Sequence, residues 1–100
     1  MAGELKKVSP DICTYVDDQH EKLYIEISLP GVEKDRIQLR MHEDSFNLSA
    51  PRNDREYVAT FSFCCPVQPE KAKAGYRHGL LKIAAPFRDA TEDSVRIDIE

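Results

Sequence analysis

The residues best suited to hold a metal ion lie in one polar segment near the N-terminus. Asp17, Asp18, His20 and Glu21 offer carboxylate oxygens and an imidazole nitrogen close together in the chain. Their spacing fits neither a calcium-binding EF-hand loop nor a zinc site. A charged segment between two apolar stretches is typical of a solvated hairpin tip. The sequence therefore predicts no metal site.

The other reactive side chains form no catalytic group. They are His20, His42, His78, Cys13, Cys64 and Cys65. The histidines are far apart and lie in no motif that would make one a base or a ligand. The cysteines form no C-x-x-C pair, and no cationic side chain beside the adjacent pair lowers a thiol pKa. Four scattered glycines build no phosphate-binding loop. We expect reduced thiols, no ATP or other cofactor, and no enzyme.

Length and composition favour one domain. The 100 residues are 41% hydrophobic and 32% charged, with a net charge of -4, which allows one apolar core. No basic cluster of the kind that binds nucleic acid is present. The charged N-terminus does not resemble a signal peptide, and no apolar run approaches the roughly 18 residues of a membrane span. We expect a cytoplasmic protein with no nucleic-acid or membrane partner.

The elements that would position any site are short strands. Residues 22–29 alternate apolar and polar side chains, the pattern of a strand with one buried face. Pro30 and Gly31 end this strand in a sharp corner. Alternation resumes from Ile37 to Met41 after a polar turn. Before the corner, residues 12–16 are β-branched and aromatic, and the polar segment 17–21 turns them back as a hairpin.

The rest of the chain repeats this pattern. Strands are predicted over residues 45–50, 56–63 and 80–84, separated by polar or proline-containing turns, and no segment has a sustained helical period. The predicted fold is an all-β antiparallel sandwich of about seven short strands. We assign residues 1–10 to a short flexible N-terminal arm, residues 11–86 to the sandwich domain, and residues 87–100 to a C-terminal extension.

Three stretches resemble the small heat-shock proteins and their alpha-crystallin domain. Ser28-Leu29-Pro30-Gly31-Val32 resembles the family's leucine-proline-glycine-valine corner. In the second stretch, 67–83, Ala74, His78, Gly79 and Leu81 occupy the places of the family's alanine, polar residue, glycine and leucine, with histidine where asparagine or aspartate is usual. The third is Ile97-Asp98-Ile99, similar to the C-terminal isoleucine-x-isoleucine motif. Together these stretches span nearly the whole chain.

The resemblance implies an immunoglobulin-like sandwich, ATP-independent holding of unfolding client proteins, and self-assembly from dimers. It also implies that the tail motif docks in an apolar groove between two strands. The tail residues are Val95, Ile97 and Ile99, and the matching groove positions are Leu39, Met41, Ala72 and Ala74. An alternative from the residues themselves is that 95–99 forms a last strand of its own domain.

Two departures from the family pattern bear on self-assembly. The loop 51–55 is too short for the strand exchange of many bacterial and plant members, which leaves edge-to-edge pairing through residues 56–63. The candidate edge residues are Tyr57, Ala59, Phe61 and Phe63. The arm of about ten polar residues, shorter and less apolar than is usual in the family, predicts small oligomers and weak holding activity.

Two other binding functions fit the same fold. A co-chaperone adaptor of the CS-domain type would bind a folded partner through a sheet face, but the tryptophans usual in that family are absent from this chain. An architectural interaction domain would fit the short arm.

Overall fold

The fold is a sandwich of two four-stranded sheets in a computed structural model that describes residues 5–19, 21–63, 65–88 and 97–100. The strands are β1 (Lys6–Val8), β2 (Ile12–Val16), β3 (Lys22–Ser28), β4 (Gln38–Met41), β5 (Ser45–Pro51), β6 (Arg55–Ser62), β7 (Lys73–Arg77) and β8 (Leu80–Pro86). Two single 3-10 turns, η1 (Lys34–Arg36) and η2 (Pro69–Lys71), lie in the connections. Neither is long or apolar enough to cross a membrane, and the described residues contain no other helix.

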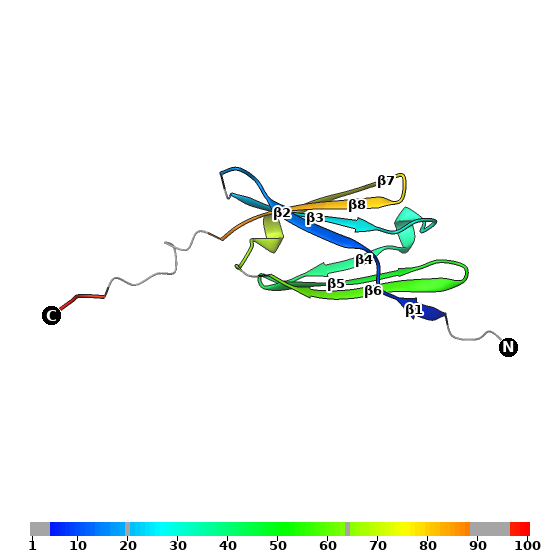
Figure 1. Ribbon diagram of the computed structural model, residues 1–100, viewed down its shortest axis with the longest axis horizontal. Coiled ribbons are helices and arrows are strands. Elements are labelled where there is room, and N and C mark those ends of the chain that lie inside the picture. The colour runs from blue at the N-terminus through cyan, green and yellow to red at the C-terminus, as the bar shows by residue number, and fades with distance from the viewer. Residues whose placement is uncertain (1–4, 20, 64, 89–96) are drawn as a thin grey trace.

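The sheets lie one above the other (Figure 1). One has the strand order β1-β6-β5-β4 and the other β2-β3-β8-β7. All neighbouring strands are antiparallel except β1 and β6, which run parallel. The predicted all-β sandwich is confirmed, with eight strands in place of about seven.

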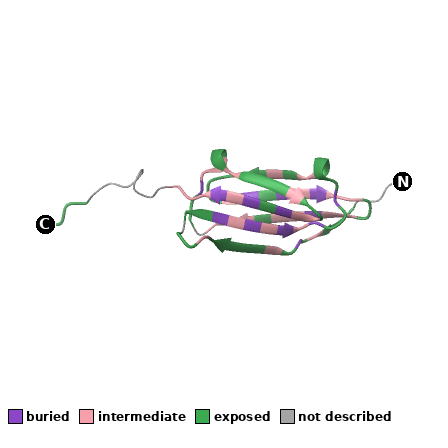
Figure 2. Ribbon diagram, turned by 90° about the horizontal axis from the view of Figure 1, so that it is seen from above, coloured by how far each residue is buried: buried purple, intermediate pink, exposed green. Residues whose placement is uncertain are grey.

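Alternation along the strands places the core between the sheets. In β3, Leu23, Ile25 and Ile27 are buried while the residues between them are only partly covered. Ile83 of β8 lies opposite Ile25 and is 2% exposed. Figure 2 shows the same alternation of buried and exposed positions along the central strands. The period of two read from the sequence therefore identifies the inward faces correctly.

The predicted corner after β3 carries the chain from one sheet to the other. The Leu29 N–H donates to the Gly79 carbonyl at 2.7 Å. The Tyr76 hydroxyl, on β7, lies 2.7 Å from the Leu29 carbonyl oxygen and 2.8 Å from that of Val32. A tyrosine hydroxyl has one proton, so the two carbonyls share it. Backbone groups at a bend have no ladder partner, and Tyr76 supplies one.

Two tight hairpins set the strand register near this corner. Between β7 and β8, His78 has a φ of 53° and Gly79 a φ of 78°, the pair of positive values that a type I′ turn requires. Asparagine and aspartate adopt such a φ more readily than histidine does. Between β5 and β6 the Arg52 N–H donates to the Arg55 carbonyl at 2.7 Å, which closes a loop as short as the sequence predicted.

The N-terminal segment differs from the expected flexible arm. Lys6–Val8 forms β1, whose residues pair with Arg55, Glu56 and Tyr57 of β6. Val8 packs against the core, and Pro10 is buried where the chain crosses to the other sheet. One apolar residue among the three of β1 is a weak strand signal, and the register comes from the neighbouring strand.

We predict that Tyr76→Phe lowers the free energy of unfolding by about 1–2 kcal/mol, because it removes the hydroxyl donor from both carbonyls but keeps the ring packing. The Leu29 carbonyl then keeps only the Val32 N–H, at 3.3 Å. Urea denaturation followed by circular dichroism measures the difference. Tyr24→Phe, which removes a hydroxyl from the outer face of the same sheet, is the matched control. Equal stability of wild type and Tyr76→Phe would contradict the assigned role.

The same pair of proteins should differ in pH dependence. Burial, and then the nearby Tyr57, raises the pKa of Tyr76 above its usual value. The folded state therefore holds this proton more tightly than the unfolded state, and the resulting stabilisation is complete below the unfolded pKa of about 10. It is lost as pH rises through the folded pKa. The stability difference between wild type and Tyr76→Phe should shrink above about pH 10.

Candidate functional site

The four groove positions chosen from the sequence lie around one cavity. Leu39 and Met41 come from β4, while Ala72 and Ala74 come from η2's end and β7, at the edge of the opposite sheet. Pro69, Lys73 and Ile83 complete the lining, and the cavity volume is about 240 Å³. β4 and β7 are the last strands of their sheets, so the cavity lies on an open side of the sandwich.

The groove is apolar and shallow. Leu39, Met41 and Ala72 are half-buried, Ala74 is exposed, and buried Ile83 lies beneath them. Both flanking strand edges lack a further partner strand among the described residues. Unpaired N–H and C=O groups beside an apolar cavity are the features that accept an added strand.

The tail residues lie away from this groove in the isolated chain. Ile97 and Ile99 are 77% and 96% exposed, and residues 97–100 form no strand. Val95 lies outside the described residues. For Ile97 and Ile99, the alternative of a last strand within the same domain is therefore not what the structure has. Two large apolar side chains are left for another surface to cover.

The candidate dimer edge is partly occupied. β1 pairs with β6 only as far as Tyr57, and Val58 to Ser62 have no strand on that side among the described residues. Tyr57 is buried, and Ala59, Phe61 and Phe63 are half-buried and pack against the core. Phe61 stacks on buried Phe46 with ring centroids 5.7 Å apart. These side chains face inward, so the strand would offer a partner its backbone edge. Phe63 lies just beyond the strand.

The family-motif residues are structural. Pro30 accepts a hydrogen bond from Arg52 Nη1 at 2.9 Å, and Gly31 has a φ of 79°. A Cβ at Gly31 would lie 2.7 Å from the same Arg52 nitrogen, so only glycine leaves room for this contact. Gly79 forms the turn described above, and Leu81 is 3% exposed in the core. Pro30, Gly31 and Gly79 therefore lie in the corner and the hairpin beside it. Ala74, the fifth motif residue, is exposed and lines the groove.

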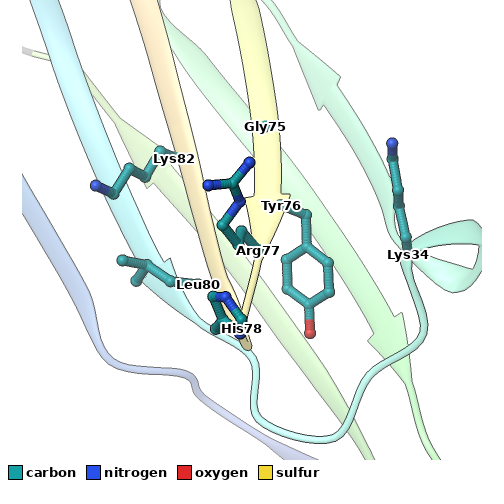
Figure 3. A pocket seen from close by; sticks show the side chains of 7 residues that line it. All are labelled: Lys34, Gly75, Tyr76, Arg77, His78, Leu80 and Lys82. Atoms are coloured by element: carbon teal, nitrogen blue, oxygen red, sulfur yellow. The ribbon is translucent and has the colours of Figure 1, made fainter.

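A basic hollow, which the sequence analysis did not identify, covers the outer face of β7 and β8. It consists of two adjoining cavities that share Gly75 and Lys82. Their other lining residues include Lys34, Arg77 and His78 in one cavity and Lys73 in the other. Figure 3 shows Arg77 and Lys82 beside the bare position of Gly75, with Lys34 on the far side of Tyr76. Lys73 and Ala74 belong to this hollow and to the groove, so the two are continuous. The β7–β8 register brings Lys73, Arg77 and Lys82 to one face, and the connection after β3 places Lys34 beside them.

Ion pairs within the described residues involve Arg52, Arg55 and Arg88, all outside the hollow. Asp54 pairs with Arg55 at 3.0 Å and with Arg52 at 3.2 Å. The hydrogen bond from Arg55 holds the pKa of Asp54 below its usual value. Across the outer face, Tyr15 donates to Glu26 at 2.8 Å, and this bond raises the pKa of Tyr15. Within the described residues no group of three or more metal-ligating side chains is present, and His20 lies outside them.

Comparison with known proteins identifies the fold. No family model matches the chain. A curated relative, the probable 15 kDa heat shock protein of Leptospira interrogans, is 23% identical over 107 residues, covering 93% of this chain and 81% of the relative. Heat shock protein 16.0 from Schizosaccharomyces pombe superposes with a TM-score of 0.75 at 17% identity, covering 94% of this chain and 77% of the yeast chain.

A bacterial structure agrees. A small heat-shock protein from Xylella fastidiosa, described as having a distinct high order structure, superposes with a TM-score of 0.71 at 17% identity. The match covers 93% of this chain and 97% of that one. The resemblance indicated by the corner, the β7–β8 hairpin and the tail motif is thus confirmed at the level of the fold.

Proposed function

Since the chain has the β-sandwich fold of the small heat-shock proteins, we propose that it is an ATP-independent chaperone that holds unfolding clients. The observation that carries the proposal is an apolar groove that lies between two unpaired strand edges. A client that exposes an extended apolar segment could add backbone hydrogen bonds at an edge and place alternate side chains in the groove. Neither interaction needs nucleotide or a metal.

The same surfaces support self-association. The β6 edge from Val58 to Ser62 has no charged side chain and no proline, the residues that usually protect an edge from pairing. Two copies could pair there in an antiparallel manner. Ile97 and Ile99 of one copy would enter the β4–β7 groove of another, and burial of each side chain would contribute about 1.5–3 kcal/mol. Residues 1–10 would then cover part of the β6 edge, and residues 11–86 would form the sandwich. Residues 87–100 would be the tail that connects one copy to another.

We predict that the full chain suppresses aggregation of a heat-denatured client at a near-stoichiometric ratio without ATP. Light scattering of the client at its aggregation temperature measures the effect. An equal mass of a stable protein without a holding function is the control. Unchanged client aggregation, from a chain that remains a monomer or dimer, would contradict the proposal and favour an adaptor that binds folded partners.

Replacing both tail isoleucines, Ile97→Ala with Ile99→Ala, should lower the mass in solution, because the apolar groove loses its occupant. Multi-angle light scattering measures the mass, and the melting temperature should change little since both side chains are exposed. Val16→Ala, which removes an exposed apolar side chain on β2, at the sheet edge opposite β7 and the groove, is the control. An unchanged mass would rule out tail docking.

Pairing through β6 predicts that Thr60→Lys weakens dimerisation by on the order of tenfold, because it places a charge on the edge strand. Asn47→Lys is a matched control. Thr60 donates a hydrogen bond to Asn47 at 3.0 Å, so both substitutions remove the same bond and add the same charge. Asn47 lies on β5, one strand in from the edge. Sedimentation velocity over a concentration series compares them, and equal effects would exclude edge pairing.

A further inference from the structure

We infer that the basic hollow recognises the acidic side chains of a second copy's tail, so that charge as well as apolar fit selects the occupant of the groove. This inference rests on the tail docking proposed above and adds a recognition surface to it. The occupant is the Ile97–Glu100 segment of another copy. Its own chain leaves this segment exposed, with Ile99 at 96%.

The charge of the chain is divided between the tail and the rest. Residues 89–100 hold five of the 18 acidic side chains and one of the 14 Lys and Arg. The first 88 residues therefore carry 13 of each and no net charge, so the whole net charge of -4 belongs to the tail. A segment of one sign is attracted to a surface of the other, and this chain contains both.

The hollow supplies the opposite sign. Lys34, Lys73, Arg77 and Lys82 are exposed, and none forms an ion pair with another described residue. Glu26 is the only acidic residue that lines the hollow, and its carboxylate accepts the Tyr15 hydroxyl at 2.8 Å. The surface is positive and its cations are available to a partner.

Strand alternation aligns the two sets of charges. On β7, Gly75 and Arg77 line the hollow but not the groove, Lys73 and Ala74 line both, and the Tyr76 hydroxyl bonds to the corner. A strand added along this edge shares its pleat, so alternate side chains point to the same two faces. With Ile97 and Ile99 directed into the groove, Asp98 and Glu100 must lie on the outer face beside the cations.

Gly75 gives the carboxylates access. Its position opposite Lys82 on β8 has no atom within 4 Å of where a Cβ would stand. The close-up in Figure 3 shows this bare stretch of strand next to Arg77 and Lys82. A short acidic side chain on the added strand can therefore reach Lys82 across β7. A larger residue at position 75 would stand between them.

The test compares charge reversals in the full chain. We expect Lys82→Glu and Asp98→Lys each to weaken association by on the order of fivefold, and the double variant to recover most of the loss. Lys22→Glu and Asp18→Lys make the same charge changes at exposed sites away from the hollow and should have little effect. Sedimentation velocity at about 0.05 M and about 0.5 M NaCl should also show weaker wild-type association at high salt.

The outcomes separate this inference from the docking itself. If Ile97→Ala with Ile99→Ala leaves association unchanged, tail docking is absent and both proposals fail. If that variant dissociates but the charge reversals and salt have no effect, the groove binds the tail and the charge inference is overturned. Failure of the double charge reversal to recover association would also overturn it. Recovery supports direct pairing of the tail carboxylates with the hollow.

Discussion

The groove and the basic hollow both depend on the contact between the Tyr76 hydroxyl and the corner after β3. The corner carries the chain from one sheet to the other, so its two carbonyls, on Leu29 and Val32, have no strand to bond to. Tyr76 stands on β7, an edge strand of the second sheet. The same bonds that complete the corner therefore fix β7, and β7 forms one side of the groove and the floor of the basic hollow. Gly79, in the turn between β7 and β8, accepts the Leu29 N–H, so a second hydrogen bond joins this hairpin to the corner.

The two open sides of the sandwich differ in chemistry. The side between β4 and β7 combines an apolar cavity with exposed cations, which suits an extended segment that has apolar and acidic residues in alternation. The side that includes the β6 edge has uncharged residues from Val58 to Ser62, and its first part is covered by β1. An uncharged backbone edge suits pairing between copies. The two surfaces share no residue, so the tail docking and the edge pairing proposed above would not compete.

A binding role agrees with the distribution of titratable groups. The perturbed groups in the described part of the chain are Tyr15, Asp54, Arg55 and Tyr76, and each is explained by a structural hydrogen bond or by burial. Asp54 and Arg55 form a surface ion pair at a hairpin, and Tyr76 supports the corner. Pairs of acid and base with pKa values pushed apart around a substrate cavity are what an enzyme needs. The cavities described above lie along strand edges and sheet faces.

Local pattern determined much of this protein. Alternation identified β3 and its buried face, and Pro30-Gly31 marked the corner. The polar segment 17–21 predicted a hairpin and residues 51–55 a short loop, because each depends on residues adjacent in the chain. Only the tertiary structure decided the rest. Lys6–Val8 became a strand because β6 offered it an edge, although its own residues favour no strand strongly. Lys73, Arg77 and Lys82 became one basic surface because the β7–β8 register places them on one face, and a register is a property of two strands that neither encodes alone. The tertiary fold brings Lys34 of η1, distant in sequence, to the same surface.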